Sequence, residues 1–219
     1  MLASERSSKW PRLILDNRAL LVRYMRAAHS TGVCLLSILG TRIGLPRTAF
    51  SNLHRIHRPS GDHVRMTRGP PRISADKPEI QTPGHTDFGS ITILFNWLGG
   101  LQVWSESSRG NYANVVDPDT SAGGQWLWVH PKLGHAIVNL GDAVVKFTNG
   151  VLCSGRHRVV PAPGEQGAFP RYSIVYFVRP EDDVILKQLK AGGIPDAKGP
   201  EERDYSERLD YKTGQRVGD

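Results

Sequence analysis

Two histidines and one aspartate, in separate parts of the chain, constrain the fold more than any other feature. His85 and Asp87 stand two residues apart, and in an extended segment their side chains lie on one face. His157 follows much later in the chain. Two imidazoles and one carboxylate can occupy one face of a six-coordinate metal and leave the opposite face open, as in 2-His-1-carboxylate iron sites. If these residues bind one metal ion, the fold must carry His157 to the other two.

A second pair of polar residues follows His157. Arg171 and Ser173 stand two apart in a segment with strand character, so their side chains share one face. A guanidinium keeps its charge in a pocket, and its planar fork matches a carboxylate. A His-x-Asp sequence alone is common by chance and usually marks a surface pair. The later histidine and the Arg-x-Ser pair, in this order, favour a metal site with a neighbouring carboxylate site.

The pattern of short apolar segments predicts a mainly β fold with flanking helices. The chain of 219 residues is long enough for one domain, and its 23 Gly and 15 Pro suit a structure with many turns. A closed or double-sheet β architecture is expected, with a small-ligand pocket in its mouth. The expected strands are residues 63–67, 90–95, 101–104, 125–129, 135–140, 152–160 and 171–178.

Helices are expected at both ends of this β region. Asp16 is a plausible N-cap for a helix over residues 16–39, with an interruption at Thr31-Gly32. Gly141-Asp142 is expected to form a turn, and residues 105–124 a surface loop. Further helices are expected at 47–53 and 182–191. The predicted organisation is an N-terminal helical segment packing on the barrel (1–60), a β domain (61–192) and a polar C-terminal tail (193–219).

Composition indicates in which compartment the protein is expected and which kinds of partner it is expected to bind. No apolar run approaches the roughly 18 residues that span a bilayer, and the first residues carry no signal-peptide core. Cys34 and Cys153 are too few for a disulfide framework, so a cytoplasmic location without membrane association is expected. Residues 1–80 hold 14 Lys and Arg against 5 Asp and Glu. Because these cations are scattered, they indicate a solvated helix face, and nucleic-acid binding is not favoured.

Other polar residues receive structural interpretations. His54, His57 and His63 match no common zinc spacing and are expected in a solvated loop. Asn139 and Asp142 are expected to satisfy backbone groups around the predicted turn.

Six blocks in order give the chain a family resemblance between residues 62 and 190. It resembles the Fe(II)/2-oxoglutarate-dependent dioxygenases of the isopenicillin N synthase-like class, most closely the members found in fungal secondary metabolism. The blocks are residues 84–90, 99–103, 138–142, 147–150, 157–160 and 171–173.

The resemblance implies a fold, an activity and a set of roles. The fold would be a double-stranded β-helix (jelly roll) over the β domain. His85, Asp87 and His157 would bind Fe(II), while Arg171 and Ser173 would bind the distal carboxylate of 2-oxoglutarate. O2 would be the second cosubstrate, with ascorbate as a supporting reductant. A small organic metabolite would be hydroxylated, or oxidised in a related way, with release of succinate and CO2.

Departures from the family pattern keep alternatives open. Thr67 and Gly69 stand where plant-type members place an Asn and a Tyr that contact 2-oxoglutarate. Family members also carry a longer N-terminal region. The alternatives are an Fe(II) oxidase of the same fold that does not use 2-oxoglutarate, a truncated non-catalytic β-barrel that binds a ligand or partner, and a nucleic-acid repair oxygenase. The identity of the substrate and the oligomeric state are left open by the sequence.

Overall fold

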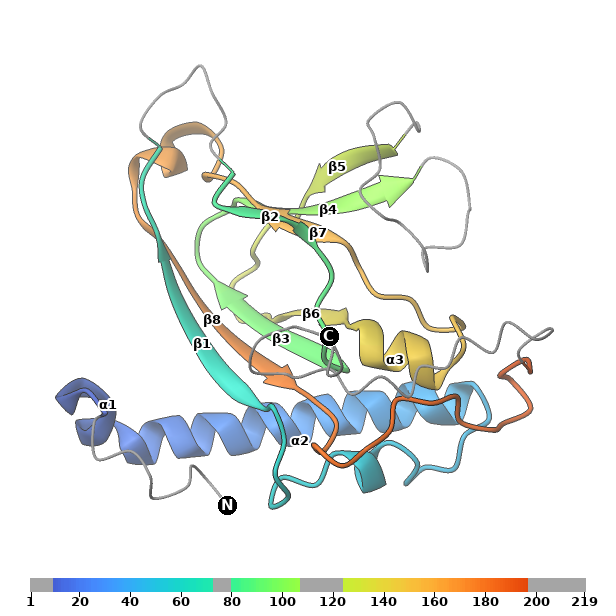
Figure 1. The fold of residues 1–219 in the computed structure, drawn as a ribbon. Coiled ribbons are helices and arrows are strands. Elements are labelled where there is room, and N and C mark those ends of the chain that lie inside the picture. The colour runs from blue at the N-terminus through green and yellow to red at the C-terminus, as the bar shows by residue number, and fades with distance from the viewer. Residues whose placement is uncertain (1–9, 73–79, 107–123, 197–219) are drawn as a thin grey trace, which may run out of the picture.

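Eight strands form two four-stranded antiparallel sheets in the part of the chain that the structure describes. A computed structural model describes residues 10–72, 80–106 and 124–196 (Figure 1). The arrangement is the jelly roll that the sequence predicted. The first sheet has the order β1 (His63–Gly69), β8 (Arg171–Val178), β3 (Ile91–Asn96), β6 (Ile137–Leu140). The second has the order β2 (Thr82–His85), β7 (His157–Val159), β4 (Leu101–Glu106), β5 (Gly124–Trp128).

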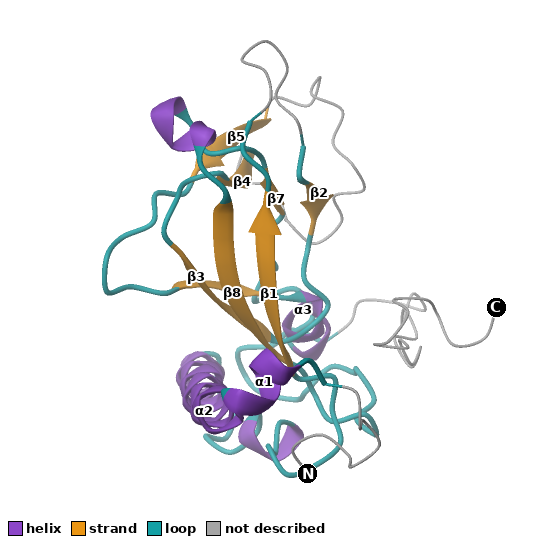
Figure 2. Cartoon of the chain, turned by 90° about the vertical axis from the view of Figure 1, so that its left-hand side faces the viewer, coloured by secondary structure: helices purple, strands orange, loops and turns teal. Residues whose placement is uncertain are grey.

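One long helix, α2 (Arg18–Arg42), packs against the first sheet and contacts β8 and β3 (Figures 1 and 2). It follows the short helix α1 (Arg12–Asp16), so Asp16 ends α1 and the N-cap of α2 is Asn17. The predicted interruption at Thr31-Gly32 is wrong, since α2 runs through it. A Cβ on Gly32 would lie 2.7 Å from Cγ2 of Val178, so this glycine allows the helix to approach β8 closely.

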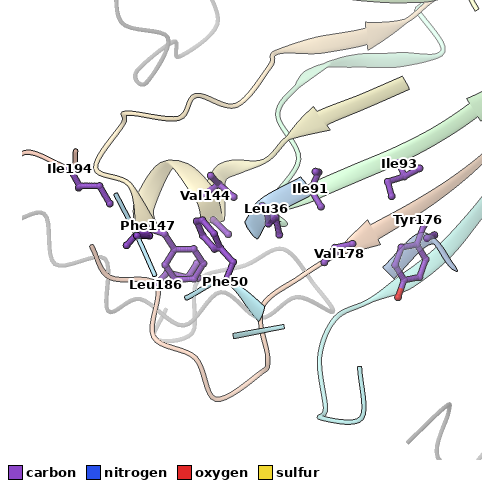
Figure 3. Packing of buried hydrophobic residues seen from close by; sticks show 13 residues of the cluster. Leu36, Phe50, Ile91, Ile93, Val144, Phe147, Tyr176, Val178, Leu186 and Ile194 are labelled. Atoms are coloured by element: carbon purple, nitrogen blue, oxygen red, sulfur yellow. The ribbon is translucent and has the colours of Figure 1, made fainter. Parts of the chain in front are cut away.

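Side chains alternate between two environments along β8 and β3. Tyr176 and Val178 on β8, with Ile91 and Ile93 on β3, point toward α2 and are almost fully buried. The alternate residues face the space between the two sheets. The main hydrophobic core therefore lies outside the barrel, between the first sheet and the helices (Figure 3). Its other members include Leu36, Phe50, Val144, Phe147, Leu186 and Ile194.

Two predictions near the C-terminal half are wrong. Gly141-Asp142 does not form a simple turn, because Gly141 is the N-cap of helix α3 (Asp142–Phe147). The predicted helix over 182–191 is absent. The backbone N–H of Leu189 donates to the carbonyl of Phe147 at 2.9 Å, and Leu186 packs in the core. Tertiary contacts with α3 thus replace local helical hydrogen bonding in this segment.

The remaining elements are shorter than their predicted ranges or differ at their ends. The predicted helix over 47–53 contains only the 3₁₀ helix η1 (Ser51–Leu53), and a second 3₁₀ helix, η4, spans Gly164–Ala168. The predicted strand over 152–160 is reduced to β7. Strands β4 and β5 extend into the predicted loop, of which residues 107–123 lie outside the described part.

The predicted C-terminal tail lies only partly within the described residues. Most of the predicted tail, residues 197–219, is outside the described part, while Ile194 is buried in the core. None of the described helices is both long and apolar enough to cross a membrane.

Candidate metal centre

The structure brings His85, Asp87 and His157 together. One ligand atom from each lies within 4.8 Å of the others. His85 is the last residue of β2 and pairs in register with His157, the first residue of β7. Their ring centroids lie 4.4 Å apart. Among the described residues, this is the group of His, Cys, Asp and Glu that could hold a metal ion.

Backbone carbonyl groups orient both imidazoles. Nδ1 of His85 lies 2.8 Å from the carbonyl oxygen of Pro83, and Nδ1 of His157 lies 3.0 Å from that of Gly155. Because a carbonyl only accepts, each Nδ1 carries the hydrogen and each Nε2 keeps a free lone pair. Both Nε2 atoms lie 3.8 Å from Oδ1 of Asp87. Ligand atoms that lie about 2 Å from one metal are roughly 3 to 4 Å apart, so this donor set fits an ion.

Asp87 has one oxygen committed to the protein and one directed at the histidines. Its side chain is 8% exposed. Oδ2 accepts hydrogen bonds from Oγ1 of Thr92 at 2.6 Å and from Nδ2 of Asn139 at 2.8 Å. Thr92 and Asn139 are ladder partners on β3 and β6. The prediction that Asn139 satisfies backbone groups is wrong in part: Nδ2 donates to the carbonyl of Leu140 at 3.4 Å, but its closer contact is Asp87. The signal that could have found these residues is their inward-facing position on adjacent strands.

The N-terminus of α3 supports the loop that carries Asp87. The backbone N–H of Asp142 donates to the carbonyl of Asp87 at 2.7 Å, and that of Ala143 donates to the carbonyl of Gly89 at 3.2 Å. Oδ2 of Asp142 accepts from the hydroxyl of Thr86 at 2.9 Å, so its predicted role toward backbone groups is also wrong. A Cβ on Gly141 would lie 2.6 Å from the Asp87 carbonyl oxygen. Gly141 therefore lets the helix approach this loop.

Arg171 and Ser173 line the same cavity as the three candidate ligands, a space of about 710 Å³ between the sheets. Nε of Arg171 donates to the carbonyl of Gly99 at 2.9 Å. Its Nη2 atom is buried and has no hydrogen-bond partner in the described structure. Oγ of Ser173 lies 2.6 Å from Oγ1 of Thr67, its ladder partner on β1. Burial lowers the pKa of the Arg171 guanidinium, which nevertheless keeps its charge. A buried charged donor without a partner, such as Nη2, favours an anionic ligand in this cavity.

The loop histidines differ from the prediction. His54 is only 2% exposed, so a solvated position is wrong for it. Its Nδ1 donates to the carbonyl of Phe50 at 2.7 Å, and its Nε2 accepts from the hydroxyl of Ser90 at 2.7 Å. Burial lowers the pKa of His54, so the neutral ring is favoured. His54 thus supports the start of β3. His57 is exposed, as predicted, whereas His63 is half-buried at the start of β1.

Comparison with known proteins identifies the family of this site. A family model described as the 2OG-Fe(II) oxygenase superfamily matches residues 60–180. The chain belongs to this superfamily. The matched range contains all three candidate metal ligands and the Arg171–Ser173 pair. Members of this 2OG oxygenase family use Fe(II), 2-oxoglutarate and O2.

Fungal 2OG oxygenases are among the most similar relatives. A 2-oxoglutarate-dependent dioxygenase of Aspergillus fumigatus is 37% identical over 87% of this chain and 50% of its own length. The 2-oxoglutarate-dependent dioxygenase iboH of Amanita muscaria is 33% identical over 89% of this chain and 87% of its own length. The chain therefore spans about half of the first relative and most of the second.

Solved 2OG oxygenase structures share the fold. A full-length Neurospora crassa protein, crystallised in complex with alpha-KG, superimposes with a TM-score of 0.72 at 23% identity, over 90% of this chain and 60% of that one. Dioxygenase for auxin oxidation 1 of Arabidopsis thaliana, in a 2-oxoglutarate complex, superimposes with a TM-score of 0.60 at 25% identity. The match covers 83% of this chain and 60% of that one. These likenesses agree with the jelly-roll assignment.

Proposed function

We propose that this 2OG oxygenase chain binds Fe(II) through His85, Asp87 and His157 and oxidises a small organic molecule with 2-oxoglutarate and O2. One observation carries the proposal. Three free ligand atoms face a common point in a cavity that also contains the unpaired Nη2 of Arg171. A facial set of two imidazoles and one carboxylate leaves positions open for a chelating keto acid and O2.

Each residue has a defined part in this chemistry. When bound, the iron would couple two reactions: the oxidative decarboxylation of 2-oxoglutarate to succinate and CO2, and the oxidation of a substrate C–H bond. The hydrogen bonds from His85 and His157 to carbonyl groups keep both Nε2 atoms directed at the centre. Thr92 and Asn139 hold the second oxygen of Asp87, so that Oδ1 alone faces the histidines.

Arg171 and Ser173 would bind the distal carboxylate of 2-oxoglutarate. The free Nη2 of Arg171 supplies a charged donor. The hydroxyls of Thr67 and Ser173 bond to each other, which leaves one hydroxyl hydrogen of the pair for a carboxylate oxygen. Thr67 would thus contribute a polar group at the position where plant-type members carry Asn.

The rest of the cavity is suited to an organic substrate. Part of its wall is apolar and would contact a hydrocarbon body. The apolar wall residues include Ile80, Leu94, Leu101, Val103, Val129, Ile137, Val138, Val159, Val175 and Phe177. The isopenicillin N synthase-like class, a role in secondary metabolism and a cytoplasmic location remain part of this proposal.

Anaerobic titration tests the proposal directly. Fe(II) and 2-oxoglutarate added together should give a weak visible charge-transfer absorption that neither gives alone. Addition of O2 together with candidate metabolites should then release succinate. Mass spectrometry would detect both the succinate and the oxidised metabolite. Fe(II) binding without any effect of 2-oxoglutarate would favour an oxidase of the same fold. Absence of Fe(II) binding would refute the proposed function and favour the non-catalytic barrel.

A further inference from the structure

Besides Arg171, two arginines of β1, Arg65 and Arg68, line the cavity; both are exposed, and the proposed chemistry uses neither. Along β1, Arg65, Thr67 and Gly69 pair with Val175, Ser173 and Arg171 of β8. Residues at alternate positions share one face of a strand, so Arg65 lies on the cavity side with Thr67 and Ser173. All six of these residues line the cavity.

Arg65 is not neutralised by the protein. Its guanidinium carbon lies 5.2 Å from the centre of the Phe177 ring, a cation–π contact. Within the described ranges, this guanidinium forms neither an ion pair nor a hydrogen bond. Asp87 is the single acid among the described residues that line the cavity, and a bound metal would occupy its Oδ1. The charge of Arg65 is thus available to a ligand.

The position of Arg65 separates it from the 2-oxoglutarate site. Arg65 is four residues from Gly69, the ladder partner of Arg171, which is roughly 13 Å along an extended strand. The guanidinium leans further away, toward Phe177. Phe177 is the ladder partner of Thr92, whose hydroxyl holds Asp87. A group bound at Arg65 would therefore lie beside the metal-binding aspartate and away from Arg171.

We propose that Arg65 binds a carboxylate of the primary substrate, so that the substrate class is an organic acid with an apolar body. This inference rests on the proposed function, because it assigns the second ligand of the same cavity. The Phe177 ring holds the guanidinium in place, and the aliphatic walls contact the rest of the substrate. Arg65 is in this sense a specificity-determining residue.

Matched acids and amides test the assignment without knowledge of the natural substrate. The probes are 4-phenylbutanoate, cyclohexylacetate and octanoate, each with its primary amide, added anaerobically to the Fe(II)–2-oxoglutarate complex. Binding is measured from the change in visible absorption and by calorimetry. In the parent, at least one acid should bind up to about 5-fold more tightly than its amide, since Arg65 is exposed and an exposed ion pair contributes up to about that factor.

Variants of three arginines test which of them causes the preference for acids over amides. Arg65→Gln should abolish the preference for acids while the Kd for 2-oxoglutarate stays unchanged. Arg26→Gln, which removes an equal charge from the exposed side of α2, should keep the preference. Arg68→Gln should also keep it, because Nε of Arg68 already donates to the Tyr172 hydroxyl at 3.2 Å.

The outcomes separate this inference from the proposed function. Normal Fe(II)–2-oxoglutarate absorption with no preference for any acid would overturn the role of Arg65 alone. Loss of the preference in Arg68→Gln, but not in Arg65→Gln, would do the same. If the absorption never forms, the proposed function fails, and the assignment of Arg65 fails with it.

Discussion

Asn139 donates a hydrogen bond from Nδ2 to Oδ2 of Asp87 at 2.8 Å, across from Thr92, which donates to the same oxygen. The two donors are ladder partners on β6 and β3, so the sheet itself fixes their separation. They leave Oδ1 as the oxygen directed at His85 and His157. The geometry of the candidate centre therefore depends on residues that touch no metal themselves.

Replacement of Asn139 should weaken metal binding. Asn139→Ala removes one of the two donors to Oδ2, which frees the carboxylate to rotate, and such changes typically cost about 10- to 100-fold in metal affinity. Anaerobic calorimetry with Fe(II) measures the effect. Asn52→Ala, at an exposed position in η1, is the matched control. An unchanged Fe(II) affinity in Asn139→Ala would contradict this positioning role.

Loss of a ligand should separate metal binding from folding. His85→Ala should abolish Fe(II) binding and turnover with little change in stability, because the His85 side chain is 42% exposed. Asp87→Ala should abolish both and also destabilise the fold by about 1 to 3 kcal/mol, because Thr92 and Asn139 lose their shared acceptor. Chemical denaturation of the metal-free proteins measures the difference. Turnover near that of the parent in His85→Ala would refute the ligand assignment.

Replacement of Arg171 should act on the cosubstrate alone. Arg171→Gln removes the buried unpaired donor, so the Kd for 2-oxoglutarate should rise about 10-fold or more, while Fe(II) affinity stays the same. Arg47→Gln, at an exposed position, controls for the lost charge. Titration of 2-oxoglutarate into the Fe(II)-loaded protein provides the measurement. An equal Kd in parent and variant would count against the role of Arg171.

A buried carboxylate should make stability depend on pH. Glu181 is 1% exposed, and Arg55 donates to both of its oxygens at 2.7 Å. The hydrogen bonds from Arg55 lower the pKa of Glu181 from 4.5 to about 2. Because the folded state binds this proton less readily, the contribution is complete above pH 4.5 and is lost as the pH falls toward 2.

Two variants test this pair. In Glu181→Gln, the free energy of unfolding should fall less than in the parent as the pH decreases over that acidic range. Arg55→Ala should destabilise the protein at neutral pH by about 1 to 3 kcal/mol, since it removes both guanidinium hydrogen bonds and leaves the buried charge with the backbone N–H of residue 55, at 3.0 Å, and the longer contact to Arg58, at 3.4 Å. Urea denaturation at a series of pH values follows both. A parent-like pH profile in Glu181→Gln would show that another group controls the acid transition.

Local signals in the sequence predicted a double-sheet β architecture and the candidate ligands, and the family resemblance specified the jelly roll. Alternating β-branched segments report a two-faced strand, and β8 matches its predicted range of 171–178. The His-x-Asp and Arg-x-Ser spacings report shared faces of extended chain. The predicted helix over 182–191 shows the limit of local signals, since that segment bonds to the carbonyl of Phe147 and packs into the core instead.

Side-chain chemistry and spacing were thus fixed by the amino-acid sequence alone, including the three metal-ligand candidates and the cation at Arg171. Only the tertiary structure decided which donor and acceptor atoms are left available to bind a metal or a ligand. The pairing of β3 with β6 directs Thr92 and Asn139 to one oxygen of Asp87, and the pairing of β1 with β8 directs Arg65 into the cavity. These roles depend on contacts between residues far apart in the chain, and no local pattern encodes a partner that folding alone brings near.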